Sequence, residues 1–227
     1  MFEEKIVLKV NEIVSQLKKQ LAPALYDIGF FDATIDNPVA REKIQNSFSG
    51  HAADIAIRAV ATKLVMFTTR SWDNNGNSIK NFLKHTRNEG DEIARISSTG
   101  RTPSIPRNDQ RIQALLDQLV RTQDELTESL KYKSLLLLRN EHIAHPLEGK
   151  SDISKKLKKD NIQVDQATYS DILRLSKQTA EAICSVIYIW DRTSKDPESA
   201  IGIAKRHTEE FWRQLPVLSK TEKITAS

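Results

Sequence analysis

The spacing of the apolar residues constrains the fold of this chain more than any other feature of its sequence. In the first 21 residues, apolar side chains recur every three or four positions, at Phe2, Ile6, Val10, Ile13, Leu17 and Leu21. This spacing places them on one face of an α-helix, because a helical turn takes 3.6 residues. The same period returns in most later segments, and we find no convincing strand pair or internal repeat. The sequence therefore predicts an all-α fold, a helical bundle of long amphipathic helices.

Capping and turn residues predict where these helices begin and end. Pro23 and Gly29 interrupt the pattern of the first helix. Asn37 is a suitable N-cap for a second helix that starts at Pro38. We expect this second helix to run on to Arg70, although Gly50 can interrupt it at some cost in stability. The turn "WDNNGN" follows, and Ser78 can then cap a short helix, "IKNFLKHTR".

The second half of the chain repeats this organisation after a polar stretch. Residues 97–109 hold one glycine and two prolines, which indicates an internal loop. The helical pattern resumes at Ile112 and is expected to continue to Pro146, because the residue before a proline is disfavoured in the α region. Two further helices are expected, over 166–192 and after Pro197. We therefore interpret residues 1–227 as a single all-α domain.

Composition narrows the class of protein. Lysine and arginine number 34 against 30 acidic residues, and the pI near 9.1 permits nucleic-acid binding without requiring it. A single cysteine excludes an internal disulfide and a zinc site built on cysteines. The N-terminus does not resemble a secretory signal. The apolar run "AICSVIYIW" is far shorter than the roughly 20 residues that span a bilayer. We expect a soluble, cytoplasmic protein with no membrane association.

The stretch "LLLLRNEHIAHP", residues 135–146, carries the candidate chemistry. Arg139 offers a permanent charge and forked donors that match a phosphate. His142 and His145 can give or take a proton near neutral pH. Asn140 can orient a neighbouring group or a ligand oxygen. These residue types suit RNA cleavage without a metal or cofactor, in which the ribose 2′-hydroxyl is the nucleophile and arginine stabilises the charge on phosphorus.

Helix geometry limits how these residues can act together in one chain. His145 lies six residues after Arg139, which on a regular helix is roughly 240° around the axis and ~9 Å along it. His142 is closer to the face of Arg139. His145 could approach Arg139 if the chain leaves the regular helix before Pro146. Alternatively, two copies of the motif could meet across a two-fold axis.

An arginine, a polar residue and then a histidine at the end of a helix resemble the signature of the HEPN nuclease superfamily. Arg139, Asn140 and His145 fit that signature with five residues between the arginine and the histidine. The sequence "LRNEHIAHP" looks most like the AbiU2-like branch, named after an abortive-infection protein. The segment "TTRSWDNNGNSIKNFL" resembles the helix, aspartate-containing turn and short helix of that branch. The resemblance covers about residues 50 to 146, and the outer helices by pattern only.

The resemblance implies a homodimer in which two motifs form one ribonuclease site. Arg139 and His145 would be the catalytic pair and Asn140 the supporting polar residue, while the pattern assigns no role to His142, which we keep as a candidate catalytic residue. A toxin or phage-defence effector that cuts RNA is the expected function. An antitoxin or other regulatory protein would be a further partner.

Alternative interpretations remain open at the level of sequence. A non-catalytic helical dimer could bind RNA or protein, and a hydrolase could hold a metal with Glu141, His142 and His145. A lysine cluster after the motif could grip the RNA backbone or form a solvated loop; it comprises Lys150, Lys155, Lys156, Lys158 and Lys159. Asp73 could be no more than a turn residue. Packing roles are expected for Trp72, Trp190, Trp212 and Cys184.

Overall fold

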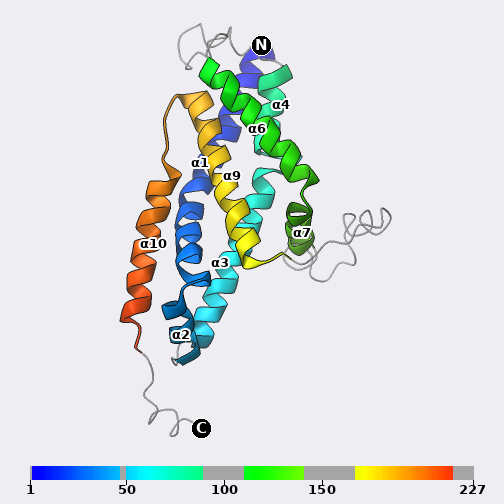
Figure 1. Cartoon of the computed structure of the whole chain (residues 1–227). Helices are drawn as coiled ribbons and strands as arrows, with labels where there is room; N and C mark the ends of the chain where they lie inside the picture. The colour runs from blue at the N-terminus through cyan, green and yellow to red at the C-terminus, as the bar shows by residue number, and fades with distance from the viewer. Residues whose placement is uncertain (1, 47–49, 89–109, 141–166, 217–227) are drawn as a thin grey trace, which may run out of the picture.

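The computed structural model of the chain describes residues 2–46, 50–88, 110–140 and 167–216 (Figure 1). These ranges contain eight α-helices and no β-strand, which confirms the all-α prediction. The helices are α1 (Phe2–Ile35), α2 (Pro38–Asn46), α3 (Gly50–Ser71), α4 (Ile79–Asn88), α6 (Gln110–Glu128), α7 (Leu130–Leu138), α9 (Tyr169–Asp191) and α10 (Pro197–Gln214).

Helix α1 is the central element of the bundle. It packs against α10, α9 and α3 along its length, and α3 also packs against α9. Helices α4 and α6 pack against each other and against α9 at the end of the bundle that holds the N-terminus (Figure 1). The short helix α7 contacts α3, α6 and α9. The end of α7 is thereby brought near the end of α3, although the two are far apart in the sequence.

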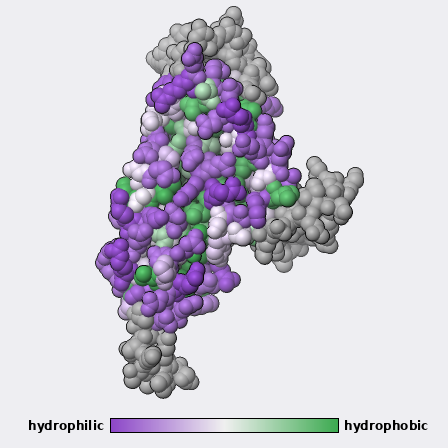
Figure 2. All heavy atoms as spheres, in the orientation of Figure 1, coloured by the Kyte–Doolittle hydropathy of each residue, from purple (hydrophilic) through white to green (hydrophobic). Residues whose placement is uncertain are grey.

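The apolar stripe of α1 forms the middle of the core. Val10, Ile13 and Leu17 have no exposed area, as the helical spacing predicts. Full burial of one such side chain stabilises a fold by about 1.5–3 kcal/mol. The predicted packing residues are also buried, namely Trp72, Trp190, Trp212 and Cys184. On the face shown in Figure 2 the surface is mainly hydrophilic, with apolar residues scattered among polar ones.

The first helix is longer than the sequence pattern predicts. Helix α1 continues through Pro23 and Gly29 to Ile35 without a break. Pro23 is exposed, while Ala24 and Ile28 continue the buried face. Gly29 has a packing role, because a Cβ there would lie 2.5 Å from the Cβ of Ala204 and 2.7 Å from the Ile201 carbonyl oxygen on α10. Tertiary burial therefore outweighs the unfavourable helix propensity of both residues.

Two expected long helices are each divided. The helix expected from Pro38 to Arg70 is split into α2 and α3. Helix α3 begins at Gly50, and glycine is required there because a Cβ would collide with the backbone carbonyl of Ile44. The helix expected from Ile112 to Pro146 is split at Ser129, which has an extended backbone and accepts a hydrogen bond from the Tyr132 N–H as the N-cap of α7. The expected loop at 97–109 lies outside the described residues.

The remaining helix boundaries follow the predicted caps. Asn37 caps α2 by accepting hydrogen bonds from the backbone N–H groups of Val39 and Ala40. The Ser78 hydroxyl accepts one from the backbone N–H of Asn81 and caps α4. None of the helices in the described ranges combines the length and apolar character needed to cross a bilayer.

Candidate functional site

Helix α7 presents the motif arginine at its C-terminal end. Leu135 is fully buried and Leu136 and Leu138 pack against the core, so the leucines before the motif attach α7 to the bundle. The chain then passes into a π-helical turn at Arg139 and Asn140. Such turns are rare and occur frequently at functional sites. The buried leucines therefore anchor α7 in the core and place the polar residues that follow at the edge of the fold.

Arg139 is held by two hydrogen bonds. Its Nη1 donates to Oδ2 of Asp73 at 3.1 Å, and its Nε donates to Oδ1 of Asn140 at 3.0 Å. The side chains of Arg139 and Asp73 are 22% and 33% exposed, so the ion pair is partly solvated and of modest strength. These contacts use Nε and Nη1, and Nη2 takes part in neither. The guanidinium is thus oriented while one of its nitrogens is not needed for that orientation.

Asp73 is placed by the turn between α3 and α4. Its backbone N–H donates to the Arg70 carbonyl at 3.2 Å, and its Oδ1 accepts from the Asn75 N–H at 3.4 Å. The preceding residue, Trp72, is 1% exposed, and its Nε1 donates to the Thr179 hydroxyl of α9 at 3.0 Å. A buried, hydrogen-bonded indole therefore fixes the start of the turn. The carboxylate is positioned before any ligand arrives.

The far end of the same turn is tied to α1. Gly76 has a φ of 77°, a left-handed conformation that glycine adopts without steric cost. The amide of Asn77 donates to Glu12 at 3.0 Å and accepts from Lys9 at 3.4 Å. The hydrogen bond from Asn77, followed by Lys9, lowers the pKa of Glu12. The turn that carries Asp73 is thereby attached to both α1 and α9.

Tyr132 lies beside the ion pair inside the fold. It precedes Arg139 by seven residues, or two turns, on the same face of α7, and it is 4% exposed. Burial raises the pKa of the Tyr132 phenol, Arg139 opposes that rise, and Asp73 adds to it. The phenol therefore stays neutral and cannot act as a base near neutral pH.

A polar cavity of about 260 Å³ adjoins Asp73 on the side of α1 and α3. It is lined by Gln16, Gln20, Arg70, Asp73, Asn75 and Asn77. The Oε1 atom of Gln20 is buried and accepts no hydrogen bond from any residue that the structure describes. Amide and guanidinium groups of this kind can bind the polar edges of a nucleotide.

The structure describes the position of only two of the predicted catalytic residues. Arg139 and Asn140 are brought together, and their side chains are hydrogen-bonded to each other. Glu141, His142, His145 and the lysine cluster lie outside the described residues. Within the ranges that are described, no three His, Cys, Asp or Glu side chains converge in a way that could hold a metal ion. The roles of His142 and His145 therefore remain predictions.

Sequence reasoning missed Asp73 and Tyr132 as neighbours of Arg139. Asp73 was interpreted as a possible turn residue, and it does stabilise the turn, but it also pairs with an arginine 66 residues later. No local pattern identifies that partner among 30 acidic residues. The spacing of seven between Tyr132 and Arg139 was the available signal for the tyrosine.

The eight helices of the described residues define an all-α protein. The family model described as AbiU2 matches residues 8–211, which include Asp73, Arg139 and His145. The chain therefore belongs to the AbiU2 family of HEPN proteins, whose name refers to abortive infection. No curated protein matches this chain, and no solved structure matches it.

Proposed function

We propose that this protein is a metal-independent endoribonuclease that cuts single-stranded RNA at a site built around Arg139. The observation that carries the proposal is the oriented Arg139 guanidinium, held by Asp73 and Asn140 at the partly exposed end of α7. An arginine prepared in this way matches the developing charge of a phosphoryl transition state. Membership of the AbiU2 family of HEPN proteins supports the same reaction class.

The reaction needs no external nucleophile. The ribose 2′-oxygen attacks the adjacent phosphorus as its proton passes to a base, and the bond from phosphorus to the 5′-oxygen breaks as that oxygen receives a proton. The products are a 2′,3′-cyclic phosphate and a 5′-hydroxyl. His145 would move these protons, and Arg139 would stabilise the charge on the phosphate oxygens. His142 would assist or support the site.

Asp73 would act as a positioning residue. Its Oδ2 is hydrogen-bonded to Arg139 and its Oδ1 to the turn, so both oxygens are engaged in the structure. A carboxylate in that position orients the guanidinium and offsets part of its charge before RNA binds. When phosphate arrives, Arg139 can keep its bond to Asp73 through Nη1 and use Nη2 for the ligand.

The active unit would be a homodimer with two copies of the motif in one cleft. One histidine could then act as base while its counterpart, still protonated, acts as acid. Two arginines near a two-fold axis repel each other, and Asp73 in each chain offsets part of that repulsion. Bound phosphate would offset more of it, so RNA should favour association.

The cellular role would be that of a toxin or phage-defence effector in the cytoplasm. The family assignment to the AbiU2 abortive-infection type supports this role. The lysine cluster that follows the motif in the chain would bind the RNA backbone. It comprises Lys150, Lys155, Lys156, Lys158 and Lys159. An antitoxin or regulatory protein would keep such an enzyme inactive until it is needed.

The test is an RNA cleavage assay in EDTA with analysis of the product ends. The purified protein should cut a single-stranded RNA and leave 2′,3′-cyclic phosphates, while Arg139→Ala protein prepared in the same way should not. Loss of cutting on chelation, with recovery on addition of zinc or manganese, would replace the proposal with metal-dependent hydrolysis. RNA binding without cleavage under all these conditions would identify a non-catalytic binding protein.

A further inference from the structure

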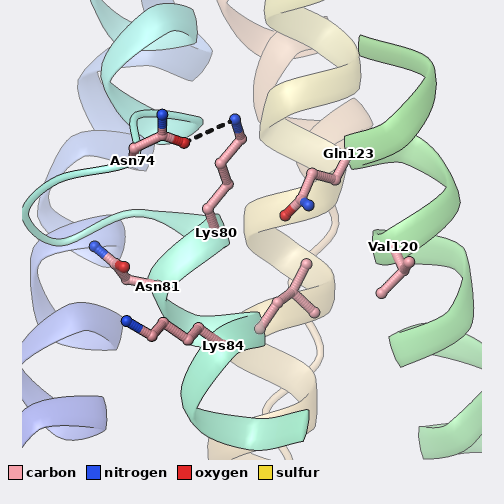
Figure 3. Close-up of a pocket in the computed structure, with 7 residues that line it drawn as sticks. Asn74, Lys80, Asn81, Lys84, Val120 and Gln123 are labelled. Carbon is pink, nitrogen blue, oxygen red and sulfur yellow. Dashed lines mark hydrogen bonds between the residues drawn. The ribbon is translucent and has the colours of Figure 1, made fainter. Parts of the chain in front are cut away.

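A second cavity lies between α4 and α6, next to the turn that carries Asp73. Its volume is about 300 Å³, at the lower end of the range of ligand pockets. Its polar lining comes from Asn74, Lys80, Asn81, Lys84 and Gln123, and its apolar lining from Leu83 and Val120 (Figure 3). In Figure 3, Lys80 and Lys84 project from α4, and Gln123 and Val120 from the facing helix α6.

The cavity has an excess of positive charge. Lys80 is partly buried and its Nζ donates at 3.1 Å to the neutral Oδ1 of Asn74 (Figure 3). Burial lowers the pKa of Lys80, and the nearby Asp73 carboxylate opposes that change. Lys84 follows four residues later on α4 and also lines the cavity, with its ammonium pointing in a different direction from that of Lys80 (Figure 3). Lys84 forms no ion pair within the described part of the chain.

Asp73 is the carboxylate that links this cavity to the Arg139 site. It pairs with Arg139 and also acts electrostatically on Lys80. Lys80, Lys84 and Arg139 thus bring three formal positive charges against the one negative charge of Asp73. A group with this imbalance attracts anions. The first turn of α4 adds to the attraction, because the N-terminal end of a helix favours negative charge.

The remaining lining offers hydrogen bonds and a small apolar surface. The amide of Asn81 donates to the Gly76 carbonyl at 2.6 Å, which fixes that side chain against the turn. The Gln123 side chain forms no hydrogen bond to a residue that the structure describes, and its amide can both donate and accept. Leu83 and Val120 can contact the face of a sugar or base. These groups together fit a nucleotide better than a simple phosphate ion.

We propose that this cavity binds one nucleotide of the RNA strand next to the nucleotide cut at Arg139. The flanking phosphate lies at Lys80 and Lys84, and the sugar and base contact Leu83, Val120 and the Gln123 amide. The inference rests on the proposed ribonuclease function for its substrate. Asn74, which lines this cavity, directly follows Asp73 in the chain, so the two sites are adjacent parts of one surface.

The experiment measures binding of a 5′-fluorescein-labelled, fully 2′-O-methylated deca-adenylate by fluorescence anisotropy. This strand lacks the free 2′-hydroxyl nucleophile, so binding is read without cleavage. The full-length double variant Lys80→Gln/Lys84→Gln should raise Kd by about tenfold at moderate salt and flatten its salt dependence. The matched control Lys63→Gln/Lys195→Gln removes the same charge outside the cavity and should change Kd by less than about twofold.

A third variant tests the cavity without removing a lysine. Gln123→Glu places a carboxylate opposite Lys80, so it should weaken RNA binding by about tenfold without lowering the Tm, because repulsion acts on the phosphate and not on the fold. Gln123→Leu should weaken binding less. Equal weakening by the two lysine pairs, or unchanged binding in Gln123→Glu, would overturn the proposal. Displacement of the strand from the wild type by equimolar adenosine monophosphate would also overturn it, in favour of a free-nucleotide pocket.

Cleavage of an unmodified deca-adenylate separates this inference from the proposed function. The Lys80→Gln/Lys84→Gln variant should raise KM and keep kcat within about threefold of the wild type, because the cavity binds without taking part in the chemistry. If the wild type never cuts RNA and only the cavity variants bind RNA more weakly, the ribonuclease proposal is wrong and the cavity proposal stands. If the wild type cuts RNA and all variants bind RNA equally, the ribonuclease proposal stands and the cavity proposal is wrong.

Discussion

Two aspartates of this protein are each surrounded by cations, yet their settings differ. Asp32 lies inside α1, and its Oδ2 accepts from Lys177 of α9 at 3.0 Å and from Lys205 of α10 at 3.4 Å. Asp73 lies in a turn at the end of α3 and accepts from Arg139 at 3.1 Å. Asp32 is 20% exposed and Asp73 is 33% exposed. Similar ion pairs therefore occur at two different kinds of position.

The difference lies in what each ion pair connects. Asp32, in the last turn of α1, joins that helix to α9 and α10, where it restrains their relative position. Asp73 joins a turn to the end of α7 and lines a polar cavity, where its arginine can contact a ligand. The chemistry of an ion pair alone does not distinguish structural from functional use. The position of Asp73 in an inter-helix turn beside a polar cavity does distinguish it from Asp32, which joins packed helices.

Substitutions of Arg139 and His145 should have the largest effects on the RNA cleavage rate. Arg139→Ala and His145→Ala should each lower the RNA cleavage rate by at least about 100-fold, because each removes a group that acts on the transition state. Arg139→Lys should also be poor, because an ammonium cannot reproduce the guanidinium fork. Thermal unfolding should shift by no more than a few degrees, and His142→Ala should have a smaller effect on rate. Full activity in His145→Ala would remove that residue from the site.

The next largest effects are expected when Asp73 and Asp32 are each replaced by asparagine, which compares the two residues directly. Asp73→Asn should lower kcat by about tenfold with little change in stability, because the amide still fills the turn but no longer holds the charge of Arg139. Asp32→Asn should keep the specific activity and lower the free energy of unfolding by about 1–2 kcal/mol. Steady-state kinetics and urea unfolding measure the two outcomes. Exchange of these two phenotypes would contradict the functional assignment of Asp73.

Gly29→Ala should reduce stability alone. The added Cβ meets the Cβ of Ala204 at 2.5 Å and the Ile201 carbonyl at 2.7 Å, so α1 and α10 must separate. Overpacking of this kind costs about 1–3 kcal/mol. Gly202→Ala is a matched control, because a Cβ there meets no atom within 4 Å. A Gly29→Ala protein that unfolds at the same urea concentration as the control would show that the close approach of α1 and α10 has no energetic weight.

The smallest expected effect concerns association. Sedimentation at increasing dilution should show a dimer that dissociates as specific activity falls, and the uncleavable RNA should shift that equilibrium modestly toward dimer. Asp73→Asn should weaken the dimer of the free protein, because the two arginines then repel each other more. Undiminished specific activity in a monomer would place the chemistry within one chain, on Arg139, His142 and His145.

The sequence predicted the helical elements better than their breaks. Periodicity identified the buried face of α1 because each turn of Val10, Ile13 and Leu17 contributes the same signal. It placed interruptions at Pro23 and Gly29, but the helix continues through both, and Gly29 packs closely against α10. It missed the break at Ser129, because the apolar period continues on both sides of that cap. Local sequence patterns therefore predict which residues are buried, but they do not predict where packing between helices keeps a helix intact.

The candidate site shows the same limit. Arg139 and Asn140 were predicted because they are adjacent in a recognisable motif. Asp73 reaches Arg139 only because α7 packs against α3, and that contact depends on how all the helices assemble. The cavity between α4 and α6 likewise joins residues about 40 positions apart. A single sequence contains no local signal for either pairing.

The most direct test is a double-mutant cycle on the cleavage rate in EDTA, with wild type, Asp73→Asn, Arg139→Lys and the double variant. If Asp73 acts by orienting Arg139, the double variant should be no more than about twofold slower than Arg139→Lys alone. The reason is that Asp73 has no guanidinium to orient once Arg139 is replaced by lysine. Multiplication of the two single losses would show that Asp73 and Arg139 act independently. Wild-type rates in all three variants would show that this ion pair is no part of a ribonuclease site.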